Sequence, residues 1–170
     1  MASQTAGKRS RRWALWLREL AIAAALLVGI SLWQGRDLLH AGEPAPDVEL
    51  TDLDGAPVHL SDLRGHKVLL YFWAPWCSVC KVVTPNLRWL AGSDQVQVVS
   101  IASSYEDLAS VRAADPESFS DIALLGGEHA AHAFSVRAYP TFYLLDEEGR
   151  IERSFLGYTS RFGLWWRTRF

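Results

Sequence analysis

The feature that most constrains the fold of this 170-residue chain is a pair of cysteines, spaced by two residues, that directly follows an apolar run. Cys77 and Cys80 are its only two cysteines, and residues 68–74 have the length and composition of a buried strand. A helix that begins at Cys77 would point free backbone N–H groups at the Cys77 sulfur atom, which favours the thiolate. The sequence therefore predicts a redox-active dithiol in which Cys77 attacks and Cys80, one helical turn later, resolves the mixed disulfide.

Two other uses of the cysteine pair are disfavoured by the sequence. A zinc site needs four ligands, and the five histidines do not stand at the spacing of a zinc finger. A purely structural disulfide between Cys77 and Cys80 would close a small loop, and the stabilisation from a disulfide grows with loop length. We therefore expect a redox-active disulfide, no bound metal and no cofactor.

The length and composition fit one globular domain with an N-terminal appendage. Hydrophobic residues make up 49% of the chain, and the net charge of -2 gives no reason to expect nucleic acid binding. Residues 13–33 are mostly apolar and would span about 31 Å as a helix, close to the thickness of a bilayer core. Because basic residues are concentrated before this segment, we predict that residues 1–12 are cytoplasmic, that residues 13–33 form a transmembrane anchor, and that the following domain is translocated.

Two alternatives to the anchor are a cleavable signal peptide and a buried helix of the globular domain. Residues 39–41, before Gly42, are a weak match to a signal-peptidase site. With either an anchor or a signal peptide, the dithiol leaves the cytosol. Residues 34–44 show no sustained periodicity and contain Pro44, so we predict a linker there and a globular domain over residues 45–170.

The order of elements in the domain predicts an α/β fold. Strands and helices alternate after the cysteine pair, which indicates a parallel β-α-β unit. An Asp-Gly turn at residues 54–55 and a second turn at residues 146–150 each separate two short strands, which predicts two β-hairpins. The expected strands are residues 48–51, 58–60, 67–73, 96–101, 122–125, 141–145 and 151–156, and the expected helices are residues 78–91, 105–113, 128–134 and 160–168.

The C-terminal segment mixes aromatic and basic residues. Thr159 or Ser160 is placed to cap the expected final helix. Residues 162–170 suit either packing of that helix on the sheet or contact with a membrane surface. We favour packing, because a helix of this length must bury an apolar stripe.

The motifs of the chain, taken in order, resemble those of the thioredoxin superfamily over residues 45–170. The segments that match its active-site segment, helix proline, cis-proline loop and late glycine are residues 72–81, Pro85, Tyr139-Pro140-Thr141 and Gly157. The segments similar to the membrane-anchored TlpA/ResA-like branch are residues 42–47, 53–55 and 60–65. Residues 157–160 and 163–166 are similar to the suppressor of copper sensitivity protein D group.

This resemblance implies a three-layer α/β/α thioredoxin-like fold with an N-terminal β-hairpin, an inserted strand-helix unit and one N-terminal transmembrane helix. It implies that a cis Tyr139–Pro140 bond lies beside Cys77 and exposes backbone that pairs with an extended substrate strand. Trp76 would offer an apolar contact to the same substrate. The expected substrate-binding residues are therefore Trp76, Tyr139 and Pro140.

The resemblance also implies a periplasm-facing thiol-disulfide oxidoreductase on the inner (cytoplasmic) membrane. Its expected partners are a membrane-embedded thiol-disulfide reductase, which donates electrons, and periplasmic substrate proteins. Reduction or isomerisation of substrate disulfides is favoured over oxidation of thiols. Two alternatives stay open: a net dithiol oxidant, and a copper-handling protein, since C-x-x-C thiolates suit Cu(I) and the C-terminal similarity points to copper tolerance.

Two positions depart from the family pattern and affect the expected mechanism. Tyr71 stands where thioredoxins usually carry a buried aspartate, and Val83 stands where TlpA/ResA-like relatives often carry a glutamate. Deprotonating a buried thiol such as that of Cys80 normally draws on such a carboxylate, because burial disfavours the charged form. We therefore expect the proton of Cys80 to leave through water or through a carboxylate from elsewhere in the fold.

Overall fold

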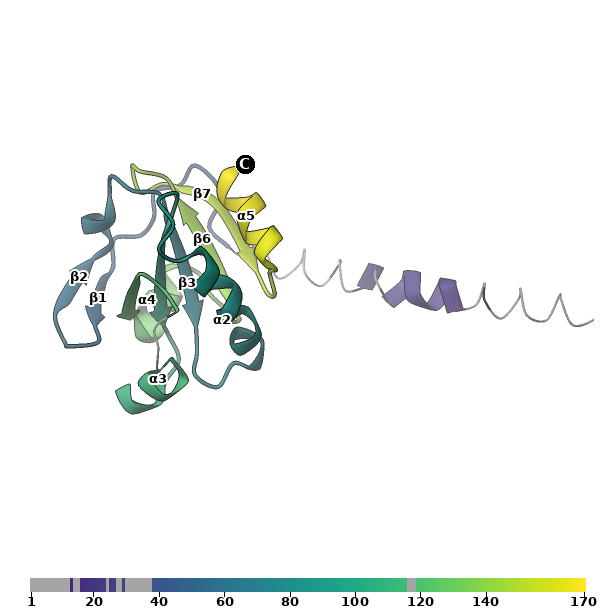
Figure 1. Cartoon of the computed structure of the whole chain (residues 1–170), viewed down its shortest axis with the longest axis horizontal. Coiled ribbons are helices and arrows are strands. Elements are labelled where there is room, and N and C mark those ends of the chain that lie inside the picture. The colour runs from purple at the N-terminus through teal and green to yellow at the C-terminus, as the bar shows by residue number, and fades with distance from the viewer. Residues whose placement is uncertain (1–12, 14–15, 24, 27–28, 30–37, 116–118) are drawn as a thin grey trace, which may run out of the picture. The chain divides into compact units, whose positions relative to one another are not determined.

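The computed structural model describes residues 13, 16–23, 25–26, 29, 38–115 and 119–170 (Figure 1). The chain divides into two compact units, Met1–Arg36 and Asp37–Phe170. The described residues of the first unit are helical, and nowhere in the described residues is a helix both long and apolar enough to cross a membrane. The predicted cytoplasmic residues 1–12 lie outside the described residues, as does much of the predicted anchor, residues 13–33.

The unit Asp37–Phe170 is built on a mixed seven-stranded sheet with the strand order β2-β1-β5-β4-β3-β6-β7 (Figure 1). The strands are β1 (Glu49–Asp52), β2 (Pro57–His59), β3 (Val68–Trp73), β4 (Gln97–Ala102), β5 (Ile122–Leu125), β6 (Thr141–Leu145) and β7 (Ile151–Leu156). The helices are η1, a short 3-10 helix (Leu60–Leu63), α2 (Ser78–Leu90), α3 (Leu108–Ala114), α4 (Gly127–Ala133) and α5 (Arg161–Arg169). Because β3 pairs parallel with β4 and each expected hairpin pairs antiparallel, the predicted α/β fold is confirmed.

Alternation along β3 divides the core into two layers. Leu69 and Tyr71 pack in one cluster, and Leu70 and Phe72 pack in the other. The first cluster contains buried side chains of α2, α3 and α5, and the second contains those of α4 and η1. Since successive side chains of a strand point to opposite faces, helices cover both faces of the sheet and give the expected three layers.

Side-chain caps determine where two of the helices begin. The Asp107 carboxylate accepts a hydrogen bond from the Ser110 N–H at 2.7 Å, so α3 begins at Leu108, later than the sequence predicted. Ser160 accepts a hydrogen bond from the Gly163 N–H at 3.2 Å and caps α5, as one of the two expected caps. The first N–H groups of a helix have no acceptor within it, which is why these side chains fix its start.

Residues 38–44, within the segment predicted as a linker, pack against the domain along β7. Leu38 is 6% exposed and belongs to one of the core clusters. The Gly42 N–H donates to the Ile151 carbonyl at 2.7 Å, and the Ile151 N–H donates to the Glu43 carbonyl at 2.8 Å. Strand β7 lies at the edge of the sheet, and this segment pairs with backbone groups that an edge strand leaves open.

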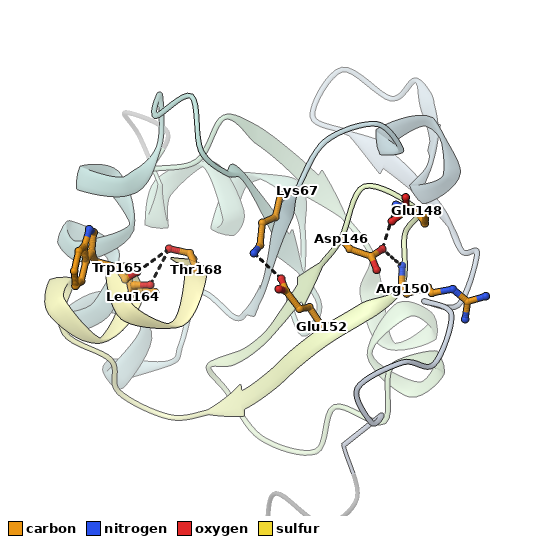
Figure 2. A network of polar contacts seen from close by, with 8 residues as sticks. All are labelled: Lys67, Asp146, Glu148, Arg150, Glu152, Leu164, Trp165 and Thr168. Carbon is orange, nitrogen blue, oxygen red and sulfur yellow. Dashed lines mark hydrogen bonds and ion pairs between the residues drawn. The ribbon is translucent and has the colours of Figure 1, made fainter. Parts of the chain in front are cut away.

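Polar contacts hold the β6–β7 hairpin and tie it to the start of β3 (Figure 2). The Asp146 carboxylate accepts hydrogen bonds from the N–H groups of Glu148 and Arg150 at 3.1 and 2.7 Å. An aspartate that binds the backbone of its own turn in this way stabilises the turn. The Lys67 Nζ atom lies 2.7 Å from Glu152 Oε2, which links β7 to the residue before β3 across the intervening strand β6.

Candidate active site

The two cysteines lie at the junction between the central strand β3 and helix α2. Their sulfur atoms are bonded to one another at 2.08 Å. Cys77 is the N-cap residue of α2, and its sulfur accepts a hydrogen bond from the Cys80 N–H at 3.1 Å. Both side chains are buried, with 5% of Cys77 and 2% of Cys80 exposed. The sequence placed the pair at the start of a helix, and the structure agrees.

The helix start gives the Cys77 sulfur an environment that favours negative charge. The N-terminal N–H groups of a helix carry partial positive charge, and no acidic residue lies in the first turn of α2. The hydrogen bond from the Cys80 N–H points at the same sulfur. Reduction of the disulfide would therefore leave a Cys77 thiolate that α2 stabilises.

The loop before β6 lies next to the disulfide segment. The Tyr139–Pro140 bond is cis. The Tyr139 ring meets the Trp76 ring edge to face, with their centroids 5.8 Å apart, so these two predicted residues are in contact. Pro140 is buried, and its carbonyl accepts a hydrogen bond from the Gly157 N–H at 2.8 Å. The structure thus brings Tyr139, which precedes Pro140 in the cis bond, into contact with Trp76, the neighbour of Cys77 in the chain.

Exposed apolar side chains lie beside the disulfide. Trp76 is 65% exposed, and its Nε1 donates to Ser104 Oγ at 3.4 Å. Burial raises the pKa of Tyr139, the negative charge of Glu128 raises it further, and a hydrogen bond with Ser103 acts in the opposite direction. The Tyr139 hydroxyl therefore stays protonated at neutral pH, and this part of the rim carries no charge.

The side of the disulfide nearest the core has no acidic group at either of the two positions where relatives carry one. Tyr71 and Val83 are both fully buried. The Tyr71 hydroxyl donates to the Cys80 carbonyl at 3.5 Å, and the Thr84 hydroxyl donates to the same carbonyl at 2.9 Å. Burial is the main cause that raises the pKa of Tyr71. The residues at both positions are therefore neutral, and neither can accept the proton of Cys80.

Asp115, just after α3, is the acidic residue that sequence reasoning did not identify. Its Oδ1 atom is buried without a hydrogen-bond partner, and its Oδ2 atom accepts a hydrogen bond from the Phe119 N–H at 3.4 Å. Burial raises the pKa of Asp115, and the Phe119 N–H and the positive charge of Arg88 partly offset that rise. The charge of Asp115 in turn raises the pKa of Tyr71, which contacts Cys80. No motif surrounds Asp115, so only the folded structure relates it to the dithiol.

The described residues contain no cluster of three or more histidine, cysteine, aspartate or glutamate side chains that could hold a metal ion. His129 and His132 are both exposed on α4. A copper ion at Cys77 and Cys80 would therefore depend on the two thiolates alone within this part of the chain.

The sheet topology, the disulfide at a helix start and the cis-proline loop beside it are those of the thioredoxin-like fold that the motifs implied. That fold and this pair define the class of protein: the thiol-disulfide oxidoreductases that work through a C-x-x-C pair. The Redoxin family model matches residues 40–162, so the chain belongs to the Redoxin family.

Individual relatives agree with this assignment and refine it. The chain is 35% identical over 124 residues to the thioredoxin-like protein YneN of Bacillus subtilis, which covers 70% of this chain and 73% of YneN. It is 27% identical over 138 residues to the thiol-disulfide oxidoreductase ResA of Bacillus thuringiensis, which covers 76% of this chain and 80% of ResA. The chain is a thiol-disulfide oxidoreductase of the TlpA/ResA-like branch.

A solved structure shows the same fold. The crystal structure of the thioredoxin domain of a thiol-disulfide oxidoreductase from Bacteroides vulgatus superimposes with a TM-score of 0.65 at 25% identity. The match covers 76% of this chain and 97% of that domain.

Proposed function

We propose that this oxidoreductase delivers electrons to disulfides of periplasmic proteins while held on the inner membrane by residues 13–33. The observation that carries the proposal is the Cys77 sulfur at the cap of α2, accepting the Cys80 N–H beside an exposed Trp76. The thiolate form of Cys77 is the nucleophile in such exchange, and Cys80 is the resolving thiol.

The electrons and atoms balance in two steps. The Cys77 thiolate attacks one sulfur of a substrate disulfide, which forms a mixed disulfide and releases the other substrate sulfur as a thiolate that takes up a proton. Cys80 then loses its proton, and its thiolate attacks Cys77 Sγ, which releases the second substrate sulfur and forms the Cys77–Cys80 disulfide. Two electrons pass to the substrate, and a membrane-embedded thiol-disulfide reductase restores the dithiol.

In this proposal the proton of Cys80 reaches Asp115 through water, because the Asp115 Oδ1 atom has no hydrogen-bond partner in the fold and the Tyr71 hydroxyl donates to the Cys80 carbonyl. Tyr71 contacts the Cys80 backbone, and Asp115 acts electrostatically on Tyr71. A half-buried carboxylate with a raised pKa is a better proton acceptor than an ordinary exposed one. Asp115 thus accepts the proton that, in relatives, passes to an acidic residue at the position of Tyr71 or Val83.

The substrate is an extended polypeptide with apolar side chains near its disulfide. Trp76, Val79 and Val82 are 65%, 44% and 62% exposed at the start of α2, and they offer apolar surface to a substrate. Tyr139 and Pro140 supply the backbone beside which an extended strand would lie. These residues position the substrate disulfide in line with the Cys77 sulfur.

The membrane location rests on the sequence: the basic residues 1–12 and the apolar residues 13–33 favour a single span with the N-terminus in the cytoplasm. Protease protection of spheroplasts tests this topology. Digestion of the domain by protease added outside supports it, and protection of the domain in intact spheroplasts contradicts it.

The reaction is tested by trapping partners with the Cys80→Ala variant, which should leave Cys77 joined to its targets as mixed disulfides. A variant that carries both Cys77→Ser and Cys80→Ala is the matched control. Recovery of a membrane reductase and of oxidised periplasmic proteins supports electron delivery. Absence of adducts beyond the control contradicts it.

The direction of electron flow is tested by the reduction potential of the pair. A value near that of the glutaredoxins, about -200 to -230 mV, or lower supports reduction, and a value near that of DsbA, about -120 mV, supports the net oxidant instead. Tight, stoichiometric Cu(I) binding that requires Cys77, together with no disulfide reductase activity, would favour the copper-handling alternative.

A further inference from the structure

Helix α5 and the residues beside it expose a group of aromatic rings to solvent. Phe162, Trp166 and Phe170 are 69%, 49% and 66% exposed, and Tyr158 before the helix is 59% exposed. The rings of Phe162 and Trp166 lie 6.4 Å apart, and those of Trp166 and Phe170 lie 4.7 Å apart. We call these four residues the aromatic face. Contiguous exposed apolar surface of this kind marks an interaction site.

A pocket of about 340 Å³ opens within the aromatic face, lined by Tyr158, Phe162, Trp166, Ser160, Gly163 and Arg167, among others. Gly163 allows the Thr159 hydroxyl, which binds Arg167, to lie close to α5, because a Cβ atom at residue 163 would lie 2.8 Å from Thr159 Oγ1. Ser160, the N-cap residue of α5, places the positive end of the helix at the same pocket. The pocket thus combines aromatic walls with positive charge.

Arg167 is a half-buried cation in the wall of this pocket. Its Nη1 atom donates to Thr159 Oγ1 at 2.9 Å, and its guanidinium carbon lies 4.5 Å from the centre of the Phe155 ring. In the described part of the chain, no carboxylate lies within ion-pair distance of it. Burial lowers the pKa of Arg167, and the positive charge of Arg153 lowers it further. An anion bound in the pocket would favour the charged form of Arg167 and offset both effects.

The positive charge around the pocket favours a partner that carries an anionic group. Residues 153–170 contain four arginines and no aspartate or glutamate. Aromatic rings together with arginine and no acidic residue suit the boundary between lipid headgroups and acyl chains. A small anion alone would use the arginine but would give no reason for four exposed rings.

We propose that the aromatic face docks on a membrane that contains anionic phospholipids, with a headgroup phosphate bound at Arg167 and the rings of Phe162 and Trp166 in the interfacial layer. This docking goes beyond the redox function and does not depend on it. The Gly157 N–H binds the Pro140 carbonyl directly before Tyr158, so a docked α5 would hold the cis-proline loop at a fixed orientation to the membrane. Such an orientation suits exchange with a membrane-embedded reductase.

The test uses the full chain labelled with 5-fluorotryptophan, in nanodiscs of phosphatidylcholine with or without phosphatidylglycerol. Lipids with a gadolinium chelate on the headgroup broaden fluorine resonances that lie near the membrane surface. The Trp166 resonance is assigned with Trp166→Phe and compared with that of Trp76, which is also exposed, assigned with Trp76→Phe. We expect stronger broadening of Trp166 than of Trp76, and more of it with phosphatidylglycerol present.

Two variants test the headgroup site, and one serves as a matched control. Arg167→Gln should reduce the phosphatidylglycerol-dependent broadening of the Trp166 resonance about fivefold, the usual contribution of one basic residue near an anionic surface. Gly163→Ala should reduce this broadening as well. Because this variant keeps Arg167, it tests the site even if Arg167→Gln fails to fold. Arg64→Gln, an exposed arginine outside α5, should weaken it less than Arg167→Gln.

Four results would overturn the proposal. The first is a Trp166 resonance that paramagnetic lipid leaves sharp, and the second is equal broadening with and without phosphatidylglycerol. The third is a change in the Trp166 chemical shift that is as large with inorganic phosphate as with phosphatidylglycerol, which would indicate a site for a free anion. The fourth is broadening that follows protein concentration and not paramagnetic lipid, which would assign the aromatic face to a second copy of the chain.

Discussion

The two sulfur atoms of the disulfide lie in different surroundings, and the difference explains why one attacks the substrate and the other resolves the mixed disulfide. Cys77 caps α2, accepts a backbone N–H and adjoins the exposed Trp76. Cys80 is enclosed by the buried side chains of Tyr71 and Val83, with no acid at either position. The helix start favours a thiolate at the first sulfur, whereas burial disfavours a thiolate at the second. After reduction, Cys77 is therefore the nucleophile, and Cys80 is a thiol that needs a proton acceptor before it can react.

The largest expected effect separates the two sulfurs directly. Cys77→Ser should reduce disulfide reductase activity to the uncatalysed rate, because no thiolate is left to attack. Cys80→Ala should keep the first attack and stall at the mixed disulfide. Non-reducing gels with a model disulfide substrate measure both results. Equal loss of adducts in the two variants would contradict the assignment of Cys77 as the attacking residue.

A smaller effect tests whether the exposed side of the pair binds substrate. Trp76→Ala should lower kcat/KM for an unfolded disulfide-containing protein about tenfold, which corresponds to about 1.4 kcal/mol of lost contact. Trp89→Ala is the matched control, because Trp89 is 48% exposed near the other end of the same helix. Equal losses for the two variants would mean that Trp76 has no special contact with substrate.

The Asp115→Asn variant tests whether Asp115 accepts the proton of the buried Cys80 thiol. The variant should slow resolution of the mixed disulfide several-fold and remove a pH dependence from that step, because the proton of Cys80 loses its acceptor. Single-turnover release of substrate over a range of pH measures this step. Unchanged resolution at every pH would show that the proton leaves by another route.

The same variant changes stability with a predictable sign. Because the pKa of Asp115 is raised above its ordinary value of 3.8, the folded state loses stability as pH rises through that raised pKa. Asp115→Asn removes this loss, so it should increase the free energy of unfolding at pH 7. The gain should vanish below pH 3.8, where the carboxyl is protonated in both states. Denaturant titrations at both pH values provide the measurement.

The smallest expected effect concerns the backbone of the resolving cysteine. Thr84→Val removes the hydroxyl that donates to the Cys80 carbonyl at 2.9 Å and leaves the shape of the side chain nearly unchanged. The free energy of unfolding should fall by about 1 kcal/mol, the usual net value of one hydrogen bond. Alkylation of Cys77 in the reduced protein should proceed as in the wild type, and a marked change there would show that the two surroundings are not independent.

The sequence predicted most of the fold because its signals are local. The apolar run before Cys77, the Asp-Gly turn at residues 54–55 and the cap at Ser160 each depend on neighbouring residues, and the structure contains the strand, the hairpin and the helix that they indicate. The later start of α3 is also local, because the Asp107 side chain competes for the first N–H groups.

What the sequence did not predict depends on contacts between distant segments. Asp115 acquires its raised pKa from burial near Tyr71, and no spacing rule relates the two residues. The packing of residues 38–44 arises from the free edge of β7, which only the strand order reveals.

The difference between the two sulfurs is tested most directly by the rate of iodoacetamide alkylation of the reduced protein as a function of pH. We predict that Cys77 ionises well below the pH of about 8.5 at which free cysteine does so, and that it is alkylated before Cys80. If Cys77 reacted with the pH profile of free cysteine, or no faster than Cys80, the start of α2 would not stabilise its thiolate.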